Sequence, residues 1–203
     1  MIEWIIAIGI HIIGLAVPIL LLPIIMADIA ICILIFNVGR NKSYGRYVWL
    51  HKLRVLQAGR IIGVGIVHLI FHDWDKLLVD NWIAYAEQFY ALDGARWPER
   101  REYSDEFKVE WAKHQNRNRH HWQYWVMIWD TGEEECLEMP LQDVLEMLAD
   151  WAGAGAAITG KMWPDDDLFA ETREWYGKNR DQIKLHDRTR NIVEGYIGYV
   201  ASK

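Results

Sequence analysis

A histidine and an aspartate stand side by side inside an apolar stretch of the chain. The segment IVHLIFHDWDK, residues 66–76, places His72 next to Asp73 where a helix would be expected to bury its face. Imidazole and carboxylate groups together suit Fe, Mn, Co, Ni or Zn better than Ca, and no soft thiolate accompanies them. Neighbouring side chains on a helix point about 100° apart. Both can still reach one ion at a helix end, where Asp73 could also bridge two ions.

More histidines and carboxylates follow along the chain. Their order is His51, His72-Asp73, His114, His120-His121 and Asp150. His114 and His121 are seven residues apart, which is two turns on one helical face if the helix continues that far. Asp150 lies among periodic apolar residues, where an unpaired buried charge would be costly and a metal ion would relieve that cost. The pattern predicts a His/Asp metal site to which several helices contribute.

This order of residues resembles the HD-domain superfamily of all-helical metalloenzymes, which are mostly phosphohydrolases and include some diiron oxygenases. The segments HDWDK, EFKVEWAKHQNRNRHHW and MPLQDVLEMLADW are more closely similar to a family of small phage and bacterial proteins of unknown function. That family carries HDxSK, HxxxNxHH and EMxxDW motifs. The resemblance covers roughly residues 48–200, and Asp75 stands where the family usually has serine.

The resemblance implies a set of metal ligands. A first ion would be held by His51, His72, Asp73 and Asp150, and Asp73 would bridge to a second ion. That second ion would be bound by His114 together with His121 or His120, a choice that the sequence does not fix. Spacing favours His121, provided that the helix continues that far. The expected cofactor is a divalent transition metal, as one or two ions of Fe, Mn, Co or Zn.

Three residues are candidates for a catalytic role. Asp73 would share its carboxylate between the ions. Lys76 follows it by three positions and is a candidate phosphate clamp or transition-state cation, although a surface lysine at a helix end fits equally well. Glu146 lies one turn before Asp150 and could orient a ligating histidine.

Four other polar residues receive weaker expectations. Arg117 and Arg119 either line a phosphate entrance or belong to a solvated helix end. His68, one turn before His72, is placed to hydrogen-bond a ligand. His186 is expected to be structural or exposed.

A His/Asp metal site favours hydrolysis of a phosphate monoester or diester, including nucleotides, because bound metal lowers the pKa of water and polarises a phosphoryl oxygen. Two alternatives remain. The same ligand order with two irons activates dioxygen in diiron oxygenases of the HD type. The protein could also be a non-catalytic phage membrane or assembly protein that retains the helical fold.

We expect the elements that position these residues to be all-α and to form an HD-domain-like helical bundle. We expect one or two helices over residues 46–78, with a break or tight-packing region at Gly59, Gly63 and Gly65. Further helices are expected over 80–92, 104–121, 140–157 and 181–200. Asp80 or Asn81 is the expected N-cap of the first of these further helices and Ser104 of the second. Residues 121–135 fit either a short helix or an extended piece. The metal-binding domain is expected to span residues 46–203.

The first forty residues predict a membrane anchor. Residues 4–36 are almost entirely apolar, which exceeds the roughly 20 residues needed to cross a bilayer. A single transmembrane helix is favoured over a hairpin turning near Pro18 and Pro23. Basic residues follow the run and none precedes it, so the N-terminus is expected outside and the C-terminal domain in the cytoplasm. A phage protein in the host inner membrane would fit this topology.

The composition of the chain limits the classes of partner that it could bind. The chain has 203 residues and a formal net charge of −6, which argues against general nucleic-acid binding. Its two cysteines, Cys32 and Cys136, are far apart in the sequence and form no disulfide framework. This favours a protein whose cysteines lie in a reducing compartment. The expected partners are the membrane, through residues 4–36, and a small phosphorylated substrate. A homo-oligomer is also compatible with the apolar segment.

Overall fold

The computed structural model describes residues 39–97, 101–160, 163 and 167–200. The predicted membrane anchor, residues 1–40, therefore lies almost wholly outside the described residues, and so does Cys32. Of the helices that are described, none combines the length and the apolar character needed to cross a membrane.

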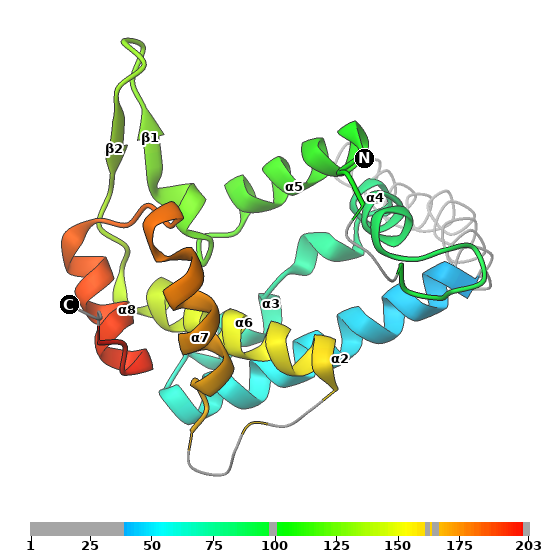
Figure 1. Cartoon of the computed structure of the whole chain (residues 1–203), viewed down its shortest axis with the longest axis horizontal. Coiled ribbons are helices and arrows are strands. Elements are labelled where there is room, and N and C mark those ends of the chain that lie inside the picture. Colours follow the sequence, from blue (N-terminus) through cyan, green and yellow to red (C-terminus); the bar gives the residue numbers. More distant parts are fainter. Residues whose placement is uncertain (1–38, 98–100, 161–162, 164–166, 201–203) are drawn as a thin grey trace, which may run out of the picture.

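The described chain is mostly helical, as predicted (Figure 1). Its α-helices are α2 (Gly39–Ile62), α3 (Ile66–Phe71), α4 (Val79–Phe89), α5 (Asp105–Arg117), α6 (Leu141–Thr159), α7 (Ala170–Asn179) and α8 (Asp187–Ile197). Short 3-10 helices are η1 (Trp74–Leu77), η2 (Trp122–Trp125) and η3 (Arg180–Gln182). Strands β1 (Val126–Ile128) and β2 (Glu134–Cys136) form an antiparallel hairpin with Val126 opposite Cys136. This hairpin resolves residues 121–135 as a 3-10 turn followed by extended chain.

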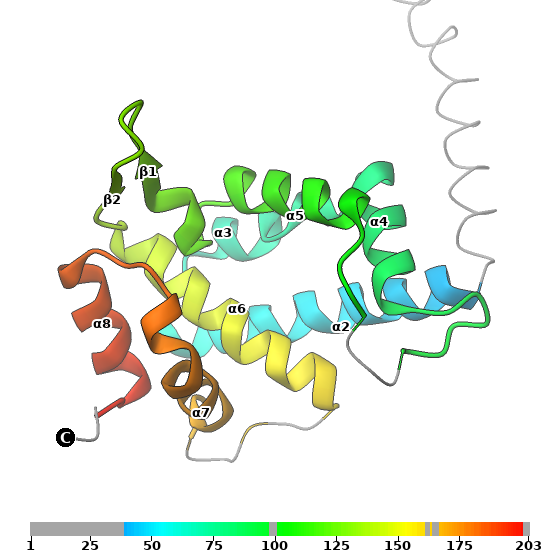
Figure 2. The ribbon, with the colours of Figure 1, turned by 45° about the horizontal axis from the view of Figure 1, so that its top comes forward.

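Helices α2 and α6 form the central pair of the fold and cross in close contact (Figure 2). Gly153 of α6 lies against the backbone of Val55 in α2. A Cβ built on Gly153 would come within 2.7 Å of the Val55 nitrogen and 2.6 Å of its Cγ2. The absence of a side chain at this position lets the two helices approach. One turn away, the same approach brings His51 of α2 opposite Asp150 of α6.

Substitution of Gly153 by alanine is expected to lower the free energy of unfolding by about 1–3 kcal/mol, because the backbone of Val55 cannot move aside without separating the helices. Gly195 offers the matched control. It lies inside α8 with nothing within 4 Å of an added Cβ, so Gly195→Ala should stabilise by about 0.5–1 kcal/mol. Urea unfolding of the two variants measures both effects. Equal effects of the two substitutions would contradict the close helix contact.

The break between α2 and α3 falls where the glycines predict it. Gly63 has φ +86°, a conformation that glycine adopts without steric cost, and Val64 donates a backbone hydrogen bond to Gly59. Helix α3 then ends at Phe71. Asp73 follows in the left-handed region with φ +52° and is the one described non-glycine residue with positive φ. Such strain is characteristic of functional sites and requires support from the surrounding structure.

Helix α4 packs beside the first half of α2, and α5 packs against α4. Tyr44 and Val48 of α2, Tyr85 of α4 and Phe107 of α5 belong to one buried aromatic cluster. Ser104 caps α5 as predicted, because its side chain accepts a hydrogen bond from the Phe107 amide. The predicted cap of α4 is wrong. The helix begins at Val79 with Leu78 as N-cap, and so Asp80 and Asn81 lie inside its first turn.

Two further helix boundaries differ from the sequence prediction. Helix α5 ends at Arg117 rather than continuing to residue 121, because Asn118 leaves the helical conformation with φ −104° and ψ 111°. The last helix, α8, begins at Asp187 rather than at residue 181. Helix α7 has weak amphipathic patterning and was not anticipated. Together, α7 and α8 contact α6 (Figure 1).

Candidate metal centre

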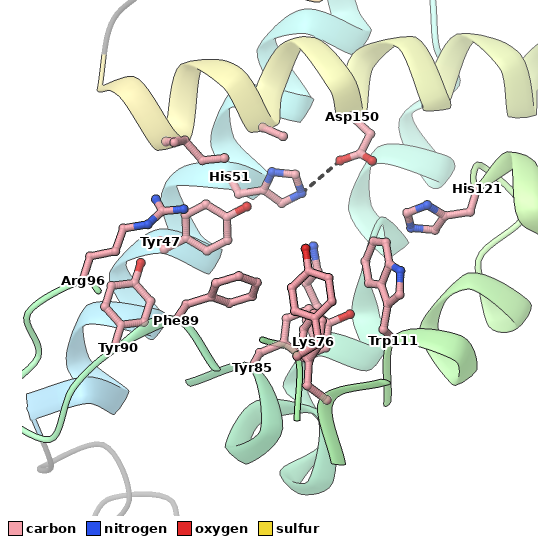
Figure 3. Close-up of a pocket in the computed structure, with 14 residues that line it drawn as sticks. Tyr47, His51, Lys76, Tyr85, Phe89, Tyr90, Arg96, Trp111, His121 and Asp150 are labelled. Carbon is pink, nitrogen blue, oxygen red and sulfur yellow. Dashed lines mark ion pairs between the residues drawn. The ribbon is translucent and has the colours of Figure 1, made fainter. Parts of the chain in front are cut away.

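Seven side chains predicted as metal ligands converge in the interior. They come from α2, the α3–η1 turn, α5, the loop after α5, and α6, and are His51, His72, Asp73, His114, His120, His121 and Asp150. All are buried by their whole-residue exposure except Asp150, whose side chain is 13% exposed. Figure 3 shows Asp150 paired with His51 at the edge of a cavity that His121 also lines.

Four donor atoms form the first cluster. His51 Nε2 lies 3.0 Å from Asp73 Oδ2 and 3.3 Å from Asp150 Oδ1. His72 Nε2 lies 3.3 Å from Asp73 Oδ2, 3.6 Å from Asp150 Oδ1 and 3.3 Å from His51 Nε2. Ligands about 2.1 Å from an ion in tetrahedral or octahedral geometry stand about 3.0–3.4 Å apart. Four of the five distances in the cluster fall in this range, and the fifth, between His72 and Asp150, is slightly longer at 3.6 Å.

The second cluster uses the other oxygen of Asp73. Oδ1 lies 3.4 Å from His114 Nε2 and 3.3 Å from His120 Nε2, and His121 Nε2 lies 2.9 Å from His114 Nε2. Both adjacent histidines therefore reach the cluster. The left-handed turn at Asp73 aims one carboxylate oxygen at each cluster, as a bridging ligand requires.

Two observations show that these donors fit a bound cation. Asp73 Oδ1 and His120 Nε2 are buried without a hydrogen-bond partner among the described residues, although they face each other. Nitrogen atoms of two histidine pairs, His51–His72 and His114–His121, point at one another at hydrogen-bonding distance. Buried polar atoms that lack a suitable hydrogen-bond partner lower the stability of the fold, and a metal ion bound among these atoms would interact with all of them. The His/Asp groups could thus hold a metal ion.

Glu146 orients two of the ligand histidines. Its Oε1 lies 3.1 Å from His72 Nδ1 and 3.2 Å from His120 Nδ1. An ionised carboxylate only accepts hydrogen bonds, so each Nδ1 carries a hydrogen and each Nε2 is the atom directed at the clusters, where loss of its proton would free a lone pair for a metal ion. Oε2 of the same carboxylate lies 2.9 Å from His68 Nδ1, which places His68 in contact with this support rather than with the clusters.

Asp75 gives the same support to a third ligand, and the sequence did not reveal it. Its oxygens lie 2.9 and 3.0 Å from His114 Nδ1, and Asn118 Nδ2 donates to Asp75 Oδ1 at 2.9 Å. Asp75 is fully buried. The Asp-x-Asp spacing and the Asn118 four residues after His114 were the available signals. The departure from serine at this position thus introduces a charged partner for a ligand histidine.

The electrostatics divide the histidines into two kinds. Burial, with a contribution from the Lys76 charge, lowers the pKa of His51 to about 4. Burial and the neighbouring histidines also lower the pKa of His121 well below its usual range. Burial also opposes the charged forms of His72 and His120, but their pKa values are raised. For His72 the Asp73 charge and hydrogen bonds to carboxylates outweigh burial, and for His120 the interactions with Asp73 and Glu146 do so.

The carboxylates remain ionised despite their burial. Burial disfavours the charged form of Asp73, but the charges of His72 and Lys76 hold its pKa well below the ordinary range. Hydrogen bonds from His120 and His72 likewise lower the pKa of Glu146 against burial. The pKa of Asp150 is lowered by His72 and His51. The two clusters therefore offer the carboxylates of Asp73 and Asp150 to a cation, and the Glu146 carboxylate supports the histidines.

Two lysines hold the turn that carries His72 and Asp73. Lys76 is buried and donates to Asp73 Oδ2 at 2.5 Å, so it is not the surface lysine of the alternative interpretation. Although burial opposes its charge, Asp73 raises the pKa of Lys76 above the ordinary value. Lys52 of α2 donates to the backbone oxygen of His72 at 2.6 Å. The strained turn is thereby fixed from both sides.

The remaining candidates lie elsewhere. Arg119 pairs with Asp143 at 2.9 Å and stacks over Trp125, so it ties the loop after α5 to α6 and does not line a phosphate entrance. Arg117 is exposed at the end of α5. His186 caps α8, where its Nδ1 accepts from the Arg188 amide, which agrees with the structural role expected for it.

Replacement of Glu146 by glutamine is expected to weaken metal binding by about 10–100-fold, since an amide oxygen holds the two Nδ1–H groups less strongly than a carboxylate. Titration of the metal-free protein with Mn²⁺, followed by isothermal calorimetry, measures the change. Glu110→Gln on α5 is the control, because Glu110 contacts Lys113 rather than the centre. Unchanged affinity in Glu146→Gln would mean that the histidines are oriented without it.

Comparison with known proteins gives one family. The family described as "Family of unknown function (DUF5662)" matches residues 40–198, which include every residue of the centre. Searches among curated proteins and among solved structures found no match. The likeness to the HD-domain superfamily stays a prediction from the motifs. With about four fifths of its length matched, the chain belongs to the DUF5662 family of unknown function.

Proposed function

We propose that this protein is a metal-dependent phosphoester hydrolase, anchored to a membrane by residues 4–36. The observation that carries the proposal is the pair of donor clusters joined by Asp73 beside an open cavity. Two ions a few ångströms apart are the arrangement by which many phosphatases and nucleases act on a phosphoryl group. The donor set of imidazoles and carboxylates suits Mn, Fe, Co or Zn.

Each residue of the centre would have a defined role in metal binding or in hydrolysis. His51, His72, Asp73 and Asp150 would hold one ion, and Asp73, His114, His120 and His121 the other. Bound metal would supply a lowered pKa for water and a positive charge to polarise the phosphoryl oxygens. Glu146 and Asp75 would keep the histidine lone pairs aimed inward. The Lys76 ammonium would stand beside the bridging carboxylate, where negative charge develops on a reacting phosphoryl group.

A cavity of about 290 Å³ adjoins the centre and supports a small substrate (Figure 3). His51, His121, Asp150 and Lys76 form one part of its wall. Aromatic side chains form most of the remainder, among them Tyr47, Tyr85, Phe89, Tyr90, Phe107 and Trp111. Rings of this kind bind a flat or apolar organic group. Arg96 projects at the far side from His121 and Trp111, where it could meet a second anionic group (Figure 3).

Replacement of Lys76 by methionine is expected to lower kcat by about 10²-fold or more with little change in the metal content, because the ammonium faces both Asp73 and the cavity. Steady-state kinetics on an aryl phosphate, with metal analysis of the same sample, separates these two quantities. Lys113→Met on α5, away from the cavity, is the control. An unaltered kcat in Lys76→Met would mean that Lys76 supports the turn at Asp73 and takes no part in catalysis.

The proposal is tested with the purified full-length protein loaded separately with Mn²⁺, Fe²⁺, Co²⁺ or Zn²⁺. We expect hydrolysis of some members of a broad panel of phosphate monoesters and diesters, and no hydrolysis after metal removal. Metal binding without hydrolysis of any panel member would count against the proposal. A visible iron absorbance that responds to dithionite and oxygen would favour the diiron oxygenase instead. Wild-type biological function in an Asp73→Ala variant would favour the non-catalytic alternative.

A further inference from the structure

A second feature of the molecule lies outside the metal centre. Large apolar side chains of α3 and η1 are exposed to solvent in one continuous stretch of chain: Ile66, Val67, Ile70, Phe71, Trp74 and Leu77, each between 48% and 64% exposed. Single exposed apolar residues are ordinary, but a contiguous group marks an interaction surface. Only Leu69 of α3 is buried. Helix α3 therefore covers the core with Leu69, directs His68 to Glu146, and turns its other four residues outward.

Helix α2 extends this surface. Trp49 is 74% exposed and Leu53 is 40% exposed, one turn apart on the same face. Lys52, between them in sequence, donates to the backbone oxygens of Ile70 and His72, so this side of α2 lies against the end of α3. Exposed Lys42, Arg46 and Arg60 continue the same helical face at spacings of three to seven residues from Trp49 or Leu53. We call this the α2–α3 face.

The charge of the α2–α3 face is one-sided. Residues 39–79 contain seven lysine and arginine residues and two acidic residues, Asp73 and Asp75. Both acidic residues are buried in the metal centre. Of the seven cations, Lys76 is buried against Asp73 and Arg40 pairs with Glu87 of α4. The exposed charges of residues 39–79 are Lys42, Arg46 and Arg60, all positive, although the whole chain has a formal net charge of −6 and the exposed Asp80 follows at the start of α4. Apolar and tryptophan side chains bordered by lysine and arginine are the composition of a helix that lies in a membrane interface.

We propose that the α2–α3 face rests on the surface of an anionic lipid bilayer. The exposed side chains of α3 and η1 would enter the headgroup boundary, with Trp49 and Trp74 at headgroup level and the basic residues near lipid phosphates. The chain that precedes α2 supplies an independent argument, because residues 4–36 are almost entirely apolar and end only three residues before Gly39. A second copy fits less well, since two positive faces would repel each other.

This contact does not depend on hydrolytic activity, and the apolar N-terminal residues alone would not produce it. Helix α3 leads directly into the turn of His72 and Asp73. A face held on the bilayer would therefore fix the distance and orientation of the metal centre relative to lipid headgroups. An anchor without this face would leave the domain free to rotate.

The test uses the full-length protein in nanodiscs of phosphatidylcholine mixed with phosphatidylglycerol. In a Cys32→Ser, Cys136→Ser background, a nitroxide is attached at Val67→Cys on α3 or at Ile128→Cys on the hairpin. These positions are 63% and 68% exposed, so neither substitution disturbs the core. Collision rates with oxygen, which concentrates in lipid, and with a water-soluble nickel chelate report the surroundings of each label.

We expect the Val67 label to collide often with oxygen and rarely with nickel, and the Ile128 label to collide freely with nickel. Addition of Arg46→Glu and Arg60→Glu should raise the nickel collisions of the Val67 label several-fold, as should nanodiscs of phosphatidylcholine alone. Frequent nickel collisions at Val67 in anionic nanodiscs would overturn the proposal. Rare collisions with both reagents would also overturn it, because they would indicate cover by protein.

Discussion

Replacement of Asp73 by alanine is expected to remove metal from both clusters and to reduce hydrolysis to background. Each oxygen of this carboxylate faces a different cluster, so one substitution takes a ligand from each. Elemental analysis by mass spectrometry of purified wild type and variant measures the number of ions per chain. Asp130→Ala, on the exposed hairpin loop, is the control. Retention of two ions by Asp73→Ala would show that the clusters do not share this ligand.

The same substitution leaves Lys76 buried without its partner, which is expected to cost about 3–5 kcal/mol of stability. Loss of metal could then follow from unfolding alone. The double variant Asp73→Ala, Lys76→Met removes the unpaired charge together with the carboxylate. We expect it to unfold close to the wild-type metal-free transition and still to bind no metal. If the double variant regained its ions, the effect of Asp73→Ala would be one of stability.

Metal loading is expected to give the second large effect, a rise in thermal stability. An ion present at 100 times its dissociation constant stabilises the folded chain by about 2.7 kcal/mol, and more if both clusters are filled. For a chain of this size the corresponding rise in Tm is about 5–10 °C. Calorimetry of the metal-free and Mn²⁺-loaded protein measures the rise. Asp73→Ala should show none, and an equal rise in that variant would place the stabilising ion elsewhere.

The size of this stabilisation is expected to increase with pH. In the metal-free protein the pKa of His72 is raised from its ordinary value of 6.5, as is that of His120. Their protons stabilise the metal-free fold fully below the unfolded pKa and cease to do so as pH rises through the folded pKa. Because binding must displace these protons, the metal-dependent rise in Tm should grow as pH increases above 6.5 through the raised pKa values of the two histidines.

His51 and His121 should contribute little to this dependence. Burial keeps both neutral near pH 7, since the pKa of His51 is about 4 and that of His121 is also lowered. Proton release on Mn²⁺ binding, measured by calorimetry in buffers of different ionisation enthalpy, gives the count directly. A rise in Tm that did not change with pH would mean that His72 and His120 bind metal without losing a proton.

The candidate ligands could be identified from sequence because their chemistry and order carry the information. Histidine beside aspartate in an apolar segment is costly unless it is satisfied, and this holds whatever the tertiary structure. The geometric argument for His121 was nevertheless wrong in its premise, because α5 ends at Arg117 and a loop, not a helical face, carries His120 and His121 inward. Loop conformation depends on contacts such as Arg119 with Asp143, which sequence periodicity does not encode.

For the residues that support the ligands, the sequence again indicates some contacts, and others depend on the tertiary structure. Glu146 could be proposed because it lies one helical turn from Asp150, yet its simultaneous contact with His68, His72 and His120 depends on how α6 meets three other segments. The role of Asp75 required the left-handed turn at Asp73, which reverses the chain between α3 and η1. The short hairpin escaped prediction because three-residue strands are too brief to show alternation.

The depth of the centre has a consequence for the rate at which metal exchanges. The donor atoms lie behind side chains whose residues are almost entirely buried, and the aromatic cavity reaches only His51, His121 and Asp150 among them. An ion in the cluster of His51 and His72 would adjoin the cavity through His51 and Asp150, whereas an ion in the cluster of His114 and His120 would adjoin it through His121 alone. Chelators should therefore strip the two clusters at different speeds, and the metal recovered with the purified protein would record which ion was abundant when the chain folded.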